Sequence, residues 1–190
     1  ATDSPINIHC IFDPSIVGEL ESRFFARLKF KYRDNIYNAT KAELIRFGRD
    51  FRNNQSLNEN EALIIGINQY VIPIDTLSDV FKYDPQLEEK TIVVVSNSST
   101  DGASIIRAHS DYFIGDISQL EATRRSIYQQ SNMVFSSNPK DIAYFLGEGP
   151  DSTDLVKEKC GSLMPCIHGC DAHSNEKVFA PADDRFCWIK

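Results

Sequence analysis

A continuous β-branched run, Thr91-Ile92-Val93-Val94-Val95-Ser96, stands at the middle of this 190-residue sequence. Such a run is typical of a strand covered on both faces, as in parallel sheets and barrels. Alternating apolar and polar residues, or short apolar runs, predict further strands before and after it. The expected strands are residues 6–12, 91–96, 132–136 and 163–170. Because helical segments separate them, the pattern indicates an α/β fold with mostly parallel strands.

The expected helices have apolar residues at helical spacing or a recognisable first turn. The first begins at Pro14, after Asp13 as its N-cap, and runs to about residue 30. The second begins after Thr40, and Glu43 would complete a capping box with it. The remaining helices are expected at residues 59–72, 76–83, 117–130, 139–146 and 151–159.

Composition places the chain among folded proteins. With 42% hydrophobic and 25% charged residues, it has enough apolar material for a core, and no apolar stretch is long enough to span a bilayer. The net charge of −7 excludes a global attraction to nucleic acid but leaves room for a local basic groove. Without an internal repeat or a Gly/Ser-rich linker, one domain over residues 1–190 is the simplest interpretation.

Cysteine usage predicts a reducing, cytoplasmic compartment. The count of five is odd, and all but Cys10 fall in residues 160–187, unlike a disulfide framework. The late cysteines and histidines could instead hold a structural zinc. These residues are Cys160, Cys166, His168, Cys170, His173 and Cys187. Their spacing, C-x5-C-x-H-x-C, matches no familiar zinc finger, so buried reduced cysteines are the simpler interpretation.

Candidate chemistry lies where strands end. His9 lies in the first strand, Ser136 and Ser137 follow the third, and Asp171-x-His173 follows the last. The carboxyl ends of parallel strands meet at one edge, where a carboxylate and imidazoles suit Zn²⁺, Mn²⁺ or Fe²⁺ and water activation. The simpler alternative for His9 is a hydrogen-bonded core histidine. The chain has no Walker A phosphate loop, no G-x-S-x-G and no H-E-x-x-H.

The late part of the chain contains the motif Ile167-His168-Gly169-Cys170-Asp171-Ala172-His173-Ser174. Together with several segments in a consistent order along the chain, this motif resembles the closing motif of PHP (polymerase and histidinol phosphatase) domains, which are metal-dependent phosphoesterases. The similarity is closest to the PHP-like domain of TrlF-type proteins, which continue into an SMC/ABC-like ATPase. The other matching segments are residues 7–14, 101–104, 135–141, 145–147 and 184–190.

The resemblance implies a distorted (β/α)7 barrel, of which this chain would hold the later strands and helices. It implies that His9, Asp171 and His173 are ligands of divalent metal ions at the carboxyl ends of the strands. The substrate would be a phosphorylated small molecule or a nucleic acid. The ATPase domain would belong to the same polypeptide, with a role in antiviral (phage) defence, and no membrane would be involved.

Departures from the family pattern define two alternatives. The family's opening His-x-His strand, a further His and a Glu ligand are not in this sequence, which begins at Ala1 without a Met. The chain is therefore expected to be the later portion of the domain and inactive alone. Ser136 or Ser137 stands where phosphoesterase members often have His, and Cys170 replaces a small Ser. The alternatives are a catalytically degenerate regulatory module and an α/β domain with structural zinc.

Overall fold

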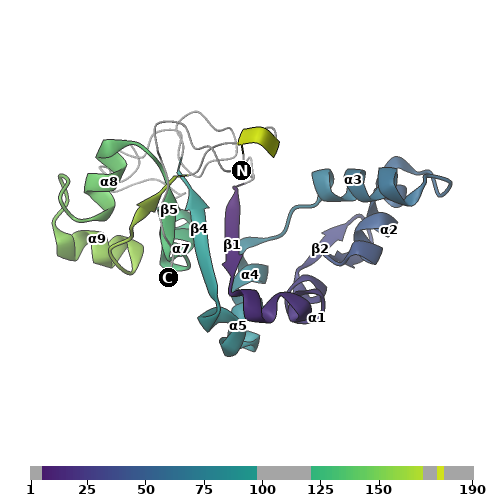
Figure 1. Cartoon of the computed structure of the whole chain (residues 1–190), viewed down its shortest axis with the longest axis horizontal. Coiled ribbons are helices and arrows are strands. Elements are labelled where there is room, and N and C mark those ends of the chain that lie inside the picture. The colour runs from purple at the N-terminus through teal and green to yellow at the C-terminus, as the bar shows by residue number, and fades with distance from the viewer. Residues whose placement is uncertain (1–5, 98–120, 169–174, 178–190) are drawn as a thin grey trace. The chain divides into compact units, whose positions relative to one another are not determined.

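The computed structural model describes residues 6–97, 121–168 and 175–177, and these form a mixed α/β structure (Figure 1). The chain divides into two compact units. The sheet unit comprises Ala1–Ile11 and Ile92–Lys190, and the hairpin unit comprises Phe12–Thr91. Among the described helices, none combines the length and the apolar character needed to cross a membrane. The α/β class is confirmed.

The sheet unit contains a four-stranded sheet in the order β1-β4-β5-β6 (Figure 1). Its strands are β1 (Ile8–Phe12), β4 (Thr91–Ser96), β5 (Met133–Phe135) and β6 (Cys166–Ile167). The last three are parallel, with Val95 opposite Val134 and Phe135 opposite Ile167. The described strands form an open sheet and do not close a barrel. Of the described residues 163–168 in the expected last strand, Cys166 and Ile167 pair with β5.

Strand β1 runs antiparallel to β4. Ser96 N donates to Asn7 O over 3.0 Å, and at the other end Asp13 N donates to Lys90 O over 2.9 Å. The start of β1 therefore lies beside the end of β4. The expectation of mostly parallel strands is confirmed for β4, β5 and β6, and β1 is an antiparallel edge strand.

Three helices of the sheet unit supply its core. They are α7 (Glu121–Gln129), α8 (Pro139–Phe145) and α9 (Thr153–Cys160); the short 3-10 helix η3 (Asn175–Lys177) follows β6. Val94, Val95 and Val134 are fully buried. Tyr128 of α7 and Phe145 of α8 are also fully buried, with ring centroids 5.3 Å apart. The β-branched strands are covered as their sequence predicts.

The hairpin unit is built from short helices, one hairpin and two longer helices. Its elements are η1 (Pro14–Glu19), α1 (Leu20–Arg23), η2 (Phe25–Arg27), β2 (Lys29–Tyr32), β3 (Asn35–Asn38), α2 (Lys41–Arg52), α3 (Glu59–Gln69), α4 (Ile74–Tyr83) and α5 (Pro85–Glu89). β2 and β3 pair antiparallel, with Phe30 opposite Tyr37. Phe30, Tyr37, Leu44 and Phe47 form the buried core of this hairpin and helix pair.

The single helix expected from Pro14 to residue 30 is wrong. Asp13 does cap the first turn, accepting from Ser15 N over 2.7 Å, but η1, α1 and η2 are short and the chain then enters β2. Alternation in Lys29-Phe30-Lys31-Tyr32 places Phe30 against Phe47, with ring centroids 4.9 Å apart. This burial of aromatic surface favours the strand over continued helix.

The capping box expected at Thr40 is also wrong, although α2 begins where it was expected. The Thr40 hydroxyl donates to Asn38 Oδ1 over 2.7 Å, and no side chain caps the first turn of α2. Asn38 Oδ1 also accepts from Thr40 N over 3.0 Å. The Thr40 hydroxyl is therefore bonded to Asn38 and does not cap the first turn of α2.

Helices α2 and α3 pack at very short range through two glycines. A Cβ placed on Gly48 would lie 1.9 Å from Ala62 O, and one placed on Gly66 would lie 2.1 Å from Leu44 O. Real side chains do not approach backbone oxygens so closely, so only glycine permits this helix pair.

We expect Gly66→Ala to destabilise the chain by about 1–3 kcal/mol, because the two helices must separate to admit the methyl group. Urea denaturation of the full chain measures this. Gly18→Ala is the matched control, since nothing lies within 4 Å of a Cβ placed there. Equal stability of the two variants would contradict the close packing.

Candidate functional site

Each of the three parallel strands leads directly into a polar residue. Asn97 follows β4, Ser136 follows β5 and His168 follows β6. The backbone continues the ladder to this point, since Asn97 N donates to Phe135 O over 3.1 Å and Ser136 N donates to Ile167 O over 3.0 Å. The three residues therefore share the carboxyl edge of the sheet, the edge at which α/β proteins bind ligands.

A buried hydrogen-bond network occupies this edge. The Asp141 carboxylate, in the first turn of α8, accepts from Asn97 Nδ2 and from Ser136 Oγ, each over 2.7 Å at Oδ2. Tyr128 of α7 donates its hydroxyl proton to Asn97 Oδ1 over 2.9 Å. Asn97, Ser136 and Asp141 are 3%, 6% and 9% exposed. We call these four residues the edge network; it ties α7 and α8 to the ends of β4 and β5.

The donors around the Asp141 carboxylate are neutral groups. Burial holds the pKa of the Tyr128 hydroxyl well above its usual range. Burial, with a smaller contribution from the charge of Asp141, raises the pKa of the Cys166 thiol to about 12. Both groups therefore keep their protons near neutral pH. The edge network is a fixed scaffold and not a proton-transfer chain.

His168 contributes an imidazole at the same edge. It directly follows β6 and is half-buried, and its Nδ1 atom is buried without a hydrogen-bond partner. Native structures leave few buried nitrogens unpaired, so this atom is a candidate for contact with a ligand. In the sequence, His168 belongs both to the cysteine-rich cluster and to the family-like closing motif that continues to Asp171 and His173.

His9 lies beside β5. Its side chain is exposed on β1, and its ring stacks on Phe135 with centroids 5.5 Å apart and an interplanar angle of 28°. Phe135 is the last residue of β5, so His9 lies near the end of that strand, but Phe135 and Ser136 of the edge network point to opposite faces of the sheet. Since His9 is exposed, it is not the hydrogen-bonded core histidine of the simpler alternative.

The expected metal ligands Asp171 and His173 lie outside the described residues. Within the described ranges, no three His, Cys, Asp or Glu side chains gather as a metal site would require. Of the three expected ligands, the described part supplies His9 alone. Ser136, at the position where the family often has His, is engaged on both sides, since it donates to Asp141 and accepts from Asn138 N over 3.2 Å.

The cysteines that the structure describes are free thiols: Cys10, Cys160 and Cys166. Burial raises the pKa of each to about 12. Cys160, Cys166 and His168 do not form a group able to hold an ion. Cys170, His173 and Cys187 lie outside the described residues, so the zinc alternative has no support from the described half of its cluster.

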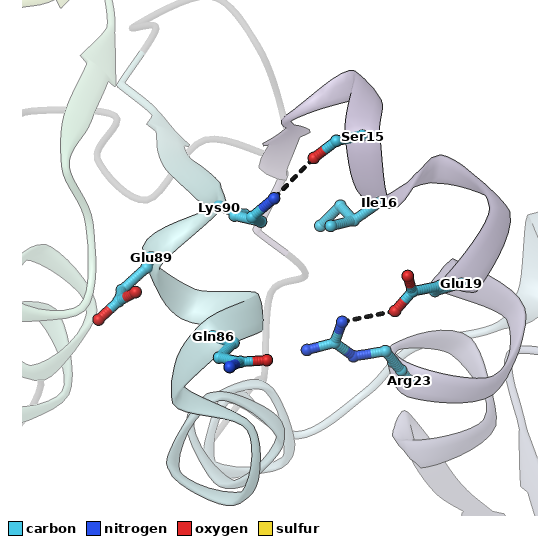
Figure 2. A pocket seen from close by; sticks show the side chains of 7 residues that line it. All are labelled: Ser15, Ile16, Glu19, Arg23, Gln86, Glu89 and Lys90. Atoms are coloured by element: carbon cyan, nitrogen blue, oxygen red, sulfur yellow. Dashed lines mark hydrogen bonds and ion pairs between the residues drawn. The ribbon is translucent and has the colours of Figure 1, made fainter.

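The hairpin unit has a polar hollow of about 430 Å³ (Figure 2). Three of its charged lining residues, Glu19, Arg23 and Lys90, form hydrogen bonds or ion pairs. Arg23 donates to both Asp84 oxygens over 2.6 and 2.7 Å and to Glu19 over 2.6 Å, and Lys90 Nζ donates to Ser15 Oγ over 2.7 Å. The Arg23 guanidinium therefore joins α1 to the start of α5, and we assign the hollow a structural role.

Sequence reasoning missed Asp141 and Tyr128 as parts of the edge network. Asp141 stands 44 residues from Asn97 and 31 residues separate Asn97 from Tyr128, so no local spacing marks the set. The available signal was the pairing of polar residues at two strand ends with an acidic residue in the first turn of a helix.

The comparisons with known proteins add no relative: no family model, no curated protein and no solved structure matches this chain.

We expect Asp141→Ala to lower the free energy of unfolding by about 2–4 kcal/mol, because it leaves the buried Asn97 amide and Ser136 hydroxyl without their acceptor. Urea denaturation of the full chain measures the loss. The control is Ser137→Ala, an exposed neighbour, with an expected change within about 0.5 kcal/mol. A loss below about 1 kcal/mol for Asp141→Ala would contradict the network's importance.

A second prediction concerns acid stability. Hydrogen bonds from Arg23 hold the pKa of the Asp84 carboxyl below its usual range. The stabilisation is therefore complete above the ordinary pKa of about 3.9 and is lost as the pH falls through the lower folded value. We expect Arg23→Gln to lose stability less steeply than the parent below about pH 4. Lys82→Gln, which removes only a 3.9 Å exposed pair with Asp79, is the control. Equal acid slopes for parent and Arg23→Gln would contradict this role.

Proposed function

We propose that this chain belongs to a PHP-like domain that hydrolyses a phosphoester of a nucleotide or nucleic acid with the help of a divalent cation. The observation that most supports this is that β4, β5 and β6 end in Asn97, Ser136 and His168 at one edge of a parallel sheet, while the His9 ring stacks on Phe135, one residue before Ser136. The sequence continues from His168 to Asp171 and His173 within five residues. The order of the family-like segments adds to the support.

In this proposal His9, Asp171 and His173 hold the cation through two imidazole nitrogens and a carboxylate oxygen. A bound Zn²⁺, Mn²⁺ or Fe²⁺ ion would lower the pKa of water and neutralise developing phosphate charge. Phe135 orients the His9 ring by stacking. The edge network holds the ends of β4 and β5 at fixed positions, because each of its buried groups has a hydrogen-bond partner.

The domain context is part of the proposal. Residues 1–190 would be the later portion of one (β/α)7 domain, and an ATPase domain would belong to the same polypeptide, acting in antiviral defence. The free thiols Cys10, Cys160 and Cys166 fit the reducing cytoplasm proposed from cysteine usage.

The test uses the full-length protein. We expect Asp171→Ala, His173→Ala and His9→Ala to lower both the bound metal, measured by elemental analysis, and the metal-dependent hydrolysis of nucleotides and oligonucleotides, by at least about 100-fold for hydrolysis. His109→Ala is the matched control, since His109 lies outside the family-like segments. Unchanged metal content and turnover in all three variants would refute the proposal.

Two observations favour a second candidate, a catalytically degenerate PHP-like module that regulates or positions the ATPase. Either Ser136 or Ser137 stands in place of the family's histidine, and Ser136 is already bonded to Asp141. β1, which carries His9, runs antiparallel to β4, whereas the strands of a (β/α)7 barrel are parallel. This candidate predicts nucleotide binding without turnover by the full-length protein. Robust metal-dependent turnover, abolished by Asp171→Ala, would exclude it.

A further inference from the structure

Positive charge is concentrated in one part of the hairpin unit. Residues 27–52 contain eight Lys or Arg against three Asp or Glu, although the whole chain has a net charge of −7. This segment comprises the end of η2, the β2–β3 hairpin and α2. Such a concentration of positive charge in an acidic protein is explained either by partners within the structure or by binding of an external anion.

Four of these cations have structural partners, and one of them is Arg33, which lies over the Tyr32 ring, 5.2 Å from its centroid. Arg46 donates to both oxygens of Glu43 and lies over the Tyr37 ring, 4.1 Å from its centroid. Arg27 lies over the Tyr83 ring at 3.6 Å. Arg49 donates to Leu57 O over 3.1 Å. Packing of the hairpin unit accounts for Arg27, Arg46 and Arg49.

The two lysines of β2 have no such account, and Arg33 in the turn has only its contact with the Tyr32 ring. Lys29, Lys31 and Arg33 are exposed, and we call them the basic strip. No described acidic side chain forms an ion pair with any of them. Lys29 and Lys31 point away from the core that Phe30 enters, and successive positions on one face of a strand are about 6.7 Å apart.

The cross-strand neighbours of the two lysines are neutral. Lys29 is opposite Asn38, and Lys31 is opposite Ile36. An acidic residue at either position would have stabilised the hairpin by a cross-strand ion pair. The face therefore presents uncompensated positive charge in a row, next to one exposed apolar side chain, Ile36, which is 64% exposed.

We infer that the basic strip binds the phosphodiester backbone of a nucleic acid. Exposed cations gathered on one strand and its turn are complementary to a polymer that carries regularly spaced negative charges. A membrane surface is less suitable, because this face has one apolar residue to insert. The outer face carries no aromatic residue for base stacking, so binding is independent of sequence. The inference stands apart from the proposed hydrolysis, because the strip lies in the hairpin unit.

The test measures fluorescence anisotropy of a labelled 20-nucleotide single strand with the full chain, in EDTA, over a range of salt concentrations. The test variant is Lys29→Gln with Lys31→Gln. The charge-matched control is Lys82→Gln with Lys157→Gln, two exposed lysines outside the strip. Losing two phosphate contacts lowers the slope of log K against log salt by about 1.4, which is about 25-fold weaker binding at 0.1 M salt. The control should bind within about twofold to threefold of the parent.

Three results would overturn the inference. One is the absence of salt-dependent binding by the parent chain. Another is equal weakening in the test and control variants, which would mean that net charge alone matters. The third is stronger binding to vesicles of anionic lipid than to the oligonucleotide. If the test variant binds normally but aggregates, the lysines protect the hairpin edges instead. Since EDTA prevents metal-dependent hydrolysis, failure here is distinguishable from failure of the phosphoesterase proposal.

Discussion

The carboxylate of Asp141 joins three elements of the sheet unit through hydrogen bonds that exclude water. Asn97 and Ser136 donate to it from the ends of β4 and β5, and Tyr128 completes the network from α7. A buried carboxylate is costly unless donors surround it, so the strand ends and α8 must remain in register. Residues that leave the sheet at this edge, including His168, depend on that register. The positions of the side chains at this edge therefore depend on the hydrogen bonds of the Asp141 carboxylate.

The buried hydrogen-bond network and the basic strip lie in different units of the chain. The edge network surrounds a carboxylate with neutral donors, which gives rigidity but little attraction for an anion. The exposed cations are instead concentrated on the hairpin, in Lys29, Lys31 and Arg33. The net charge of −7 therefore does not reveal the basic region on the hairpin.

The main strands of the sheet were predictable because β-branched runs are strong local signals, as in Thr91–Ser96. The hairpin was not, because the apolar residues before it also fit helical spacing, and the alternation at Lys29–Tyr32 is only four residues long. The contact of Phe30 with Phe47 favours strand over helix at Lys29–Tyr32, and local sequence does not reveal this contact because the two residues are far apart in the chain. His9 was identified from sequence and lies beside β5, whereas Asp141 was missed because its partners are distant along the chain. Asp171 and His173 stay predictions.

The central claim is that a cation site forms at the carboxyl edge of the sheet around His9. A crystal structure of the full-length protein grown with Mn²⁺, with anomalous diffraction data, tests it most directly. The account predicts an anomalous peak within coordinating distance of the His9 imidazole, the Asp171 carboxylate and the His173 imidazole, beside an intact Asn97–Asp141–Ser136 network. A manganese ion bound elsewhere, with these three side chains apart from one another, would contradict it.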